Sequence, residues 1–239
     1  QNELTAIWKV SSSSSATKIS TDAIDNAIQK FNEEEIAASF AFDYAQGGRF
    51  FVGFTFESER IPSATFVYEA TASALSGRSV WHERQTGPSA NRWRVNTITK
   101  AFGTLFAGDQ LDGRIGIVDL DTYAEYGEPM QRVTATAPFF AAGLPVFAGE
   151  YRLHMQAGVG LANGVGSDPQ ITRSFSDDGG RTFNDGVHRS FGKIGEYEVI
   201  PAWRRQGRIP RARTLRFSTS APVKFVIIKL EALAEAGFQ

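Results

Sequence analysis

Short stretches rich in apolar and β-branched residues recur along this chain, separated by glycine, aspartate or proline. Their spacing of roughly ten residues is typical of β-sandwiches, β-barrels and β-propellers. In the first part of the chain we predict strands within 36–44, 50–56, 64–68, 79–84, 91–98, 103–107 and 115–120. In the later part we predict strands within 149–158, 171–175, 199–203, 214–217 and 223–230. The pattern therefore predicts an all-β protein in which propeller-type blades are followed by a second, antiparallel β region.

One segment near the N-terminus departs from the strand pattern. Ser20, Thr21 and Asp22 are residue types that favour a helix N-cap, and Ile24 and Ile28 after them fall on one helical face. The run of five serines at 11–15 is predicted to be a loop. We therefore expect one short helix close to the N-terminus.

A joint rich in glycine, proline and alanine at 138–145 is the predicted boundary between two β regions. We expect an N-terminal segment with the short helix over 1–30, propeller-like blades over 31–137 and a C-terminal β domain over 146–239. A weak internal echo favours the propeller, because residues 51–69 resemble residues 105–120 at an offset of roughly fifty residues. Two blades do not close a ring, so the rest would lie in absent sequence or in other subunits.

The composition excludes several classes of protein. A net charge of −1 gives no general attraction to nucleic acid or to anionic membranes. The chain has no cysteine, which excludes disulfides, thiolate metal sites and a cysteine nucleophile. No apolar run is long enough for a transmembrane helix. Residues 1–4 show no signal-peptide pattern and no initiator methionine, so we expect a processed chain or part of a longer product.

The segment from Ser176 to Phe183 has the S-x-D-x-G-x-T-F form of an Asp-box. Glycine tolerates a positive φ, so the chain can reverse tightly here. An aspartate can accept hydrogen bonds from the turn backbone, and serine and threonine hydroxyls can cap the strand ends. Phe183 is expected to tuck under the hairpin. We predict a fold-stabilising turn formed by Ser176, Asp178, Gly180, Thr182 and Phe183.

Residues 204–216 contain six arginines and no acidic residue. Guanidinium groups bind carboxylates and phosphates in a bidentate geometry, so the segment could contact other subunits or nucleic acid. It could also be a solvated hairpin whose arginines pair with nearby acids. We favour subunit or DNA contact for this strip, which comprises Arg204, Arg205, Arg208, Arg211, Arg213 and Arg216.

Metal and cofactor motifs are absent from the sequence. The histidines, His82, His154 and His188, lack zinc-binding spacing. The glycine-rich stretch 158–166 lacks the end of a phosphate-binding loop, and we interpret it as a flexible loop. The acidic runs 33–35 and 119–121 are interpreted as solvated acids. We expect no catalytic residue, no cofactor and no metal.

A sialidase-like carbohydrate-active enzyme or carbohydrate-binding module is the alternative, because Asp-boxes are frequent in sialidases. Arg60-Ile61-Pro62 matches a tripeptide of that class, and Glu196-Tyr197 could mimic its Tyr–Glu nucleophile pair. However, the Asp-box occurs once where several are expected, and the tripeptide recurs at 208–210. These signals favour the alternative only weakly.

A set of short motifs in a fixed order resembles one family. The motifs are Lys18-Ile19-Ser20-Thr21-Asp22-Ala23-Ile24, Trp81-His82-Glu83-Arg84, Gly113-Arg114-Ile115, Leu120-Asp121-Thr122-Tyr123, Gly158-Val159-Gly160, Gly166-Ser167-Asp168-Pro169-Gln170, Ser176-Asp177-Asp178-Gly179-Gly180-Arg181-Thr182, Gly192-Lys193-Ile194-Gly195-Glu196-Tyr197, Trp203-Arg204-Arg205 and Pro222-Val223-Lys224. Together they resemble the tail-nozzle proteins of short-tailed phages, also called packaged-DNA-stabilisation proteins. The resemblance spans residues 17–228 and corresponds to the C-terminal half of longer family members.

The resemblance implies a structural virion protein that contains a β-propeller and has no catalytic residues. Such proteins form a homo-oligomeric ring, typically of six copies, below the portal and adaptor and above the tail tip or needle. The ring closes the tail channel, retains packaged DNA without sequence specificity and passes it during genome ejection. The expected location is the phage tail in the virion, with the host cytoplasm during assembly.

Overall fold

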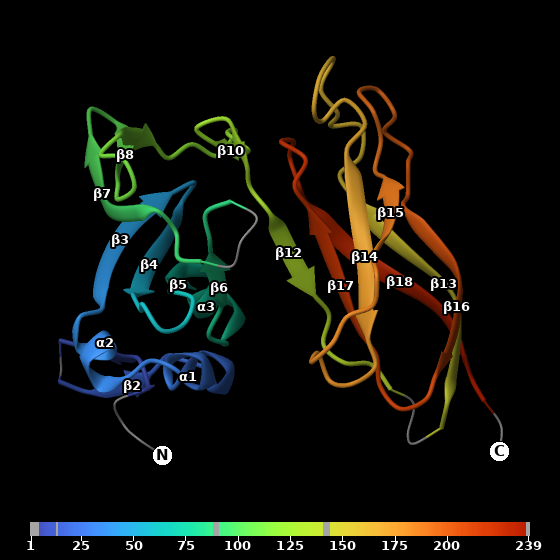
Figure 1. Ribbon diagram of the computed structural model, residues 1–239, viewed down its shortest axis with the longest axis horizontal. Helices are drawn as coiled ribbons and strands as arrows, with labels where there is room; N and C mark the ends of the chain where they lie inside the picture. Colours follow the sequence, from blue (N-terminus) through green and yellow to red (C-terminus); the bar gives the residue numbers. More distant parts are fainter. Residues whose placement is uncertain (1–4, 13, 88–90, 141–143, 238–239) are drawn as a thin grey trace. The chain divides into compact units, whose positions relative to one another are not determined.

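The computed structural model describes residues 5–12, 14–87, 91–140 and 144–237 (Figure 1). The predictions made on residues 1–4, on Ser13 within the serine run and on residues 141–143 within the joint lie outside the described residues. The chain divides into two units, Gln1–Thr122 and Tyr123–Gln239, and each is described by itself. No helix in the described ranges has the length and apolar character needed to cross a membrane.

The first unit is built from antiparallel sheets and short helices. Its sheets have the strand orders β1-β2, β3-β4-β5-β6 and β7-β8-β9. The elements are β1 (Trp8–Val10), β2 (Ala16–Lys18), α1 (Asp22–Ile28), α2 (Glu33–Ala37), β3 (Phe40–Gln46), β4 (Arg49–Phe56), β5 (Ala64–Glu69), α3 (Ala70–Ser76), β6 (Trp81–Arg84), β7 (Val95–Ala101), β8 (Thr104–Asp109) and β9 (Ile115–Ile117).

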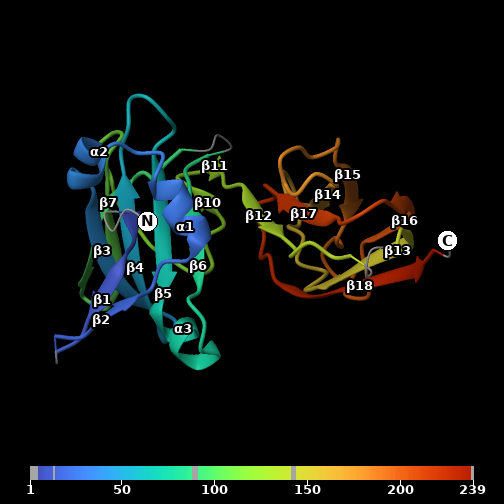
Figure 2. The ribbon, with the colours of Figure 1, turned by 90° about the horizontal axis from the view of Figure 1, so that it is seen from below.

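The predicted N-terminal helix is present as α1, with Thr21 at its N-cap. Its apolar face, Ile24 and Ile28, packs in one cluster with Phe56 and Phe66 of the four-stranded sheet. Figure 2 shows α1 lying beside β5. Burial of this apolar face, rather than the helix propensity of seven residues, holds so short a helix in place.

A second cluster joins the four-stranded sheet to β7 and β8. It contains Phe42 and Tyr44 from β3, and Trp93 and Leu105 from the second sheet region. Gly53 allows this packing, because a Cβ atom there would lie 2.3 Å from the Phe42 ring. The four-stranded sheet therefore has apolar contacts on both faces.

Two helices were missed from the sequence. A capping box between Asn32 and Glu35 starts α2, so the strand predicted from residue 36 begins only at Phe40. The alanine-rich α3 follows β5 directly and ends at Gly77, which adopts a left-handed φ of 66°. Local capping and a left-handed glycine thus created helices inside a region with strand-like spacing.

The second unit is a sandwich of two antiparallel sheets, with strand orders β12-β17-β14-β15 and β16-β13-β18 (Figure 1). A small pair, β10-β11, precedes them. The strands are β10 (Ala124–Glu125), β11 (Glu128–Pro129), β12 (Arg132–Ala135), β13 (Val146–Met155), β14 (Gln170–Ser176), β15 (Val187–Ser190), β16 (Ala202–Ile209), β17 (Thr214–Thr219) and β18 (Ile227–Ala236).

The core of the second unit lies between its two sheets. Tyr151 and Trp203 come from one sheet, Ile171 and Phe217 from the other, and all four belong to one buried cluster. β12 pairs with β17, so the joint predicted at 138–145 lies inside this unit. The division into 1–30, 31–137 and 146–239 stays a prediction, whereas the all-β class with antiparallel sheets is confirmed.

Candidate functional site

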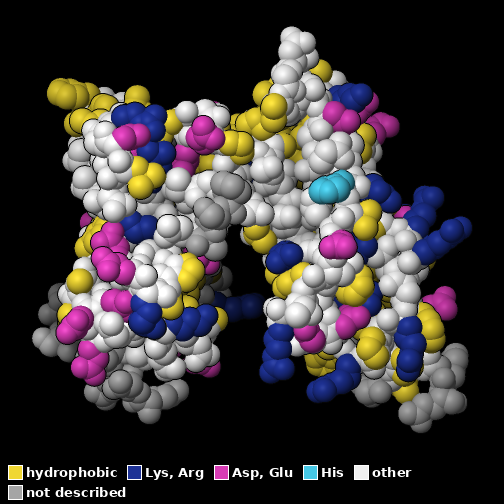
Figure 3. Space-filling view, viewed as in Figure 1, with side chains coloured by type: hydrophobic (Ala, Val, Ile, Leu, Met, Phe, Trp, Pro, Cys, Tyr) yellow, Lys and Arg dark blue, Asp and Glu magenta, His cyan; other side chains and the backbone are white. Residues whose placement is uncertain are grey.

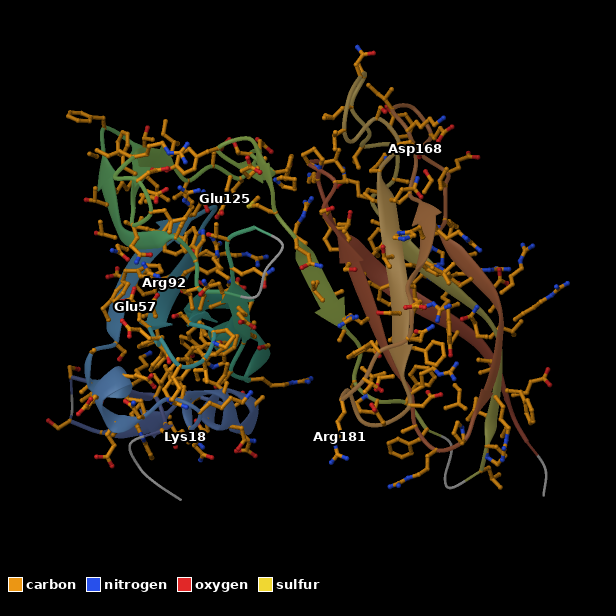
Figure 4. All side chains as sticks on the ribbon, viewed as in Figure 1. Lys18, Glu57, Arg92, Glu125, Asp168 and Arg181 are labelled. Atoms are coloured by element: carbon orange, nitrogen blue, oxygen red, sulfur yellow. The ribbon has the colours of Figure 1, made fainter. Side chains whose placement is uncertain are left out.

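The Asp-box segment forms the turn between β14 and β15, and Arg181 lies at its tip (Figure 4). Asp178 Oδ1 accepts hydrogen bonds from the backbone N–H groups of Arg181 and Thr182, at 2.9 and 3.0 Å. Its Oδ2 accepts from the Thr182 hydroxyl at 2.6 Å. Ser176 Oγ donates to Asp178 at 2.6 Å and accepts from the N–H of Gly180 at 2.8 Å. One carboxylate therefore organises the whole turn.

Phe183 takes a different position from the one expected. Its ring is only partly buried and does not join the core cluster of the sandwich. Instead the guanidinium of Arg216 lies 4.0 Å from the ring centroid, and Arg216 Nε donates to Ser174 Oγ at 3.1 Å. Phe183 thus fixes the hairpin by stacking with a cation rather than by filling the core.

Asp178→Asn is expected to lower the unfolding temperature of the second unit at neutral pH. Hydrogen bonds from Ser176 and then Thr182 hold the pKa of Asp178 well below its usual 3.8. The ionised carboxylate therefore stabilises the native state above pH 3.8, and this contribution is lost as the pH falls toward the folded-state pKa. Thermal unfolding between pH 7 and about pH 3 should show the gap between wild type and variant narrowing.

Asp185→Asn is the matched control, because Asp185 lies on the same hairpin and is exposed. It should unfold like the wild type throughout the pH series. A gap between wild type and Asp178→Asn that widens on acidification would refute the assigned role of the carboxylate.

The arginine strip separates into two groups in the structure. Arg213 is 2 % exposed and forms a bidentate pair with Asp177, with both N–O distances 2.7 Å. Its guanidinium also lies 3.8 Å from the centroid of the Phe175 ring. Arg213, directly before β17, and Arg216 on β17 therefore hold the sandwich together and are not available to a partner.

The other four arginines are exposed on β16 and the turn after it; they are Arg204, Arg205, Arg208 and Arg211. Dark blue side chains gather over this strand in Figure 3. Arg204 pairs with Glu150 at 3.2 Å. The remaining three form no ion pair with an acid of the described residues. These four side chains form the exposed arginine edge, the candidate contact surface of the molecule.

Arg205 has a backbone conformation that few residues adopt. Its φ is 57°, in the left-handed region, where a non-glycine residue costs roughly 1–2 kcal/mol. The strained residue lies in a β-bulge between β13 and β16. Ala148 pairs with Gly207 and Glu150 with Arg204, so β16 has one more residue between these pairs than β13 has. Bulges of this kind redirect side chains and often occur at functional positions.

A hollow of about 400 Å³ lies beside this edge and contains two carboxylates. Its lining residues are Glu150, Arg152, Glu231, Ala232 and Leu233. Hydrogen bonds from Arg152 and Arg204 lower the pKa of Glu150. Those from Lys229 and His154 lower the pKa of Glu231 to about 2.

A glycosidase needs a protonated carboxyl group near neutral pH as its general acid, with a raised pKa. Glu150 and Glu231 have lowered pKa values, so both carry a negative charge at neutral pH. The hollow therefore does not have the electrostatics of a glycosidase site.

The residues of the sialidase-like alternative are engaged elsewhere. Arg60 pairs with Glu35 at 3.0 Å and is not free to hold a substrate carboxylate. Glu196 accepts a hydrogen bond from the N–H of Lys193 within its own turn, at 2.8 Å. Tyr197 is exposed, and its ring covers Gly158, where a Cβ atom would lie 2.5 Å from the ring. The structure thus brings the loops 158–166 and 192–197 together, which the sequence did not indicate.

The histidines and acidic runs are dispersed. Burial, followed by the neighbouring Arg84, lowers the pKa of His82 to about 4. His154 contacts Glu231 at 2.9 Å, and His188 contacts Thr172 at 2.7 Å. Across the ranges that the structure describes, no group of three acidic or histidine side chains could hold a metal ion.

The acidic runs have local structural roles. Glu35 completes the capping box of α2 and accepts a hydrogen bond from Ser58 at 2.5 Å. Asp119 accepts a hydrogen bond from the hydroxyl of Thr122 at 3.1 Å.

Comparison with solved structures gives distant similarities only. Three structures of an exo-β-1,3-galactanase from Phanerochaete chrysosporium, one with galactose and two of variants with β-1,3-galactotriose, are 10 %, 11 % and 12 % identical to the chain. Their TM-scores are 0.24, 0.23 and 0.22, and these values carry no argument about function. The matches cover 81 % of this chain and 56 % of the galactanase chain. No curated protein matches the chain.

Two family descriptions match the chain in succession. Residues 1–123 match "Bacteriophage P22 Gp10, beta-propeller", and residues 131–235 match "Bacteriophage P22 Gp10, beta-sandwich". The resemblance to tail-nozzle proteins is thus confirmed, and the two matches cover most of the chain. The chain belongs to the bacteriophage P22 Gp10 family of structural tail proteins of the virion, with a β-propeller part followed by a β-sandwich.

Proposed function

We propose that this protein is a nozzle subunit that forms a homo-oligomeric ring, of six copies, in the phage tail. The ring lies below the portal and adaptor and above the tail tip or needle. It closes the tail channel and retains the packaged DNA without reading its sequence. The protein has no catalytic residue and no cofactor, and the host cytoplasm is its location during assembly. The succession of the two P22 Gp10 matches over most of the chain is the observation that carries this proposal.

The charge of the protein agrees with a conduit for DNA. Its net charge is −1, so the subunit as a whole does not attract the phosphate backbone strongly. A channel that releases DNA at ejection benefits from weak contacts. A strongly basic lumen would hold DNA through many phosphate contacts.

The exposed arginine edge is the surface that we assign to contacts between subunits. Arg205, Arg208 and Arg211 project from one strand and its turn, and none of them has an acidic partner within the part of the chain that the structure describes. Bidentate contacts with carboxylates of a neighbouring copy would satisfy them. The strained φ of Arg205 supports this role, because strain of this kind is retained where a side chain has a function.

The function is tested on particles. A phage with a stop codon in this gene should package DNA and then lose it, so that the DNA becomes sensitive to added nuclease. Electron microscopy of wild-type tails should show a ring at the nozzle position that contains this protein. A protein that remains monomeric both when purified and in particles would contradict the proposal, as would full DNA retention without it.

The triple variant Arg205→Glu, Arg208→Glu and Arg211→Glu is expected to prevent ring formation. Three reversals place like charges against the partner carboxylates, and association constants should fall at least a hundredfold, equivalent to about 3 kcal/mol. Light scattering after size-exclusion chromatography measures the loss. The matched control reverses Lys9, Arg78 and Lys100, which are exposed residues of the first unit.

Arg205→Gly separates stability from assembly. Glycine adopts a φ of 57° without strain, so the variant should be at least as stable as the wild type. If Arg205 contacts a neighbouring copy, the same variant should form rings less readily. Rings that form normally from the triple variant would exclude this edge as the contact, while leaving the nozzle function to be decided by the particle experiment.

A further inference from the structure

A group of polar side chains lies between the two sheets of the second unit, where a sandwich normally has apolar ones. Arg173 of β14 is 3 % exposed and Tyr151 of β13 is fully buried. Arg213, directly before β17, is beside them and interacts with the Tyr151 hydroxyl. Arg173 lies between Ile171 and Phe175 on β14, and alternate residues of a strand share one face. Its side chain is therefore on the face of β14 that packs in the core.

The charges in this group do not balance. Arg213 is matched by Asp177 through its bidentate pair. Arg173 has no acidic partner in the described residues, and its Nε and Nη1 atoms are buried without a hydrogen bond. Arg189 of β15 is exposed to solvent and adds only a further positive potential. Two buried guanidinium groups thus share one carboxylate.

A buried guanidinium stays positively charged, because arginine does not lose its proton in proteins. Burial is the main cause that lowers the pKa of Arg173; Tyr151 opposes it, and repulsion from Arg213 and Arg189 adds to it. Arginine nevertheless remains protonated in proteins. The Phe175 ring, 5.5 Å from the guanidinium, offers only a weak cation–π contact. An isolated buried charge is costly and needs a counter-charge.

The unpartnered groups are mainly donors. Arg173 presents two N–H groups, and the Tyr151 hydroxyl is also buried without a hydrogen bond of normal geometry. Donors that converge in a positive potential suit an acceptor with a negative charge. A water molecule could accept these hydrogen bonds, but it would leave the excess charge in place.

The side of the sandwich next to Arg173 is closed by polar contacts between β15 and β16. Arg189 Nε donates to the carbonyl of Ala202 at 3.0 Å, and Trp203 Nε1 donates to the carbonyl of Val187 at 2.9 Å. Val187 is the residue paired with Arg173 in the sheet. This closure limits the size of an occupant. We propose that the second unit binds a small inorganic anion of halide size between Arg173 and Tyr151.

The first test uses the unaltered full-length chain. Crystals grown in sodium bromide should show an anomalous scattering peak within hydrogen-bond distance of the Arg173 guanidinium. Thermal unfolding should also occur at higher temperature in sodium chloride than in sodium gluconate at the same ionic strength, because an ion that binds only the native state stabilises it in proportion to the logarithm of its concentration. Bromide peaks confined to the surface, together with equal unfolding temperatures in the two salts, would overturn the proposal.

The second test uses variants to identify the site. Arg173→Met keeps the length of the side chain and removes the charge, so the variant should unfold at the same temperature in chloride and gluconate. Tyr151→Phe should retain a reduced chloride effect, because only one donor is lost. Arg181→Met, at an exposed arginine of the same unit that lies outside the exposed arginine edge, is the matched control and should keep the full effect. An unchanged chloride effect in Arg173→Met would exclude this site.

Discussion

Asp177→Asn is expected to destabilise the second unit by about 3 kcal/mol. Asp177 neutralises Arg213, which is 2 % exposed, through two N–O contacts of 2.7 Å. The amide cannot carry the counter-charge, and its NH₂ group opposes an arginine N–H. Loss of one partner from a buried pair typically costs 3–5 kcal/mol, and the lower end applies because the Asp177 side chain is 28 % exposed.

Fluorine NMR of the chain labelled with 5-fluorotryptophan measures this loss in the second unit alone. Of the four tryptophans, only Trp203 lies after residue 122, so its signal reports the unfolding of this unit in urea. Asp185→Asn on the same hairpin should stay within about 0.5 kcal/mol of the wild type, as is usual for a surface substitution. An Asp177→Asn variant as stable as that control would show that the pair does not stabilise the fold.

The same variant connects the ion pair with the inferred anion. Without Asp177, the excess charge of Arg173 and Arg213 is larger, so a bound anion should become more important. The difference in unfolding temperature between chloride and gluconate should therefore be greater for Asp177→Asn than for the wild type. An equal difference would mean that the carboxylate and the anion do not act on the same charge.

The sequence was sufficient where structure depends on neighbours in the chain. The Asp-box turn was predicted because Asp178 bonds residues three and four positions later, and the order of residue types carries that information. The short helix α1 was predicted for the same reason. By contrast, α2 and α3 interrupt a region of strand-like spacing, and that spacing alone predicts strands where local caps produce helices.

For the arginine strip, the composition of the segment does not reveal which side chains are buried. The sequence predicts one contact surface of six arginines, but Arg213 alternates with Leu215 and Phe217 and shares their buried face. Period-two alternation could have indicated this, as it could for Arg173 between Ile171 and Phe175. That Asp177 would meet Arg213 depends on the pairing of β14 with β17, which no local pattern specifies.

Trp203→Ala is expected to cost about 3–5 kcal/mol, the range for removing a large aromatic side chain from a core. Trp203 is 1 % exposed, and its ring centroid lies 5.6 Å from that of Phe217. The substitution leaves a cavity between the sheets. It also removes the donor to the Val187 carbonyl, which links the edge strands β15 and β16. Differential scanning calorimetry of the full chain measures the effect.

Trp203→Phe distinguishes the contribution of aromatic packing from that of the hydrogen bond to the Val187 carbonyl. It keeps most of the aromatic volume and should cost only about 1–2 kcal/mol. Trp8→Ala is the control for loss of an exposed tryptophan, because Trp8 is 49 % exposed. Since Trp203 precedes Arg204 on β16, a loosened strand should also disturb the exposed arginine edge. We therefore expect Trp203→Ala to weaken ring formation although the charge of the exposed arginine edge is unchanged. A variant that is destabilised but assembles normally would show that the contact between subunits lies on another surface.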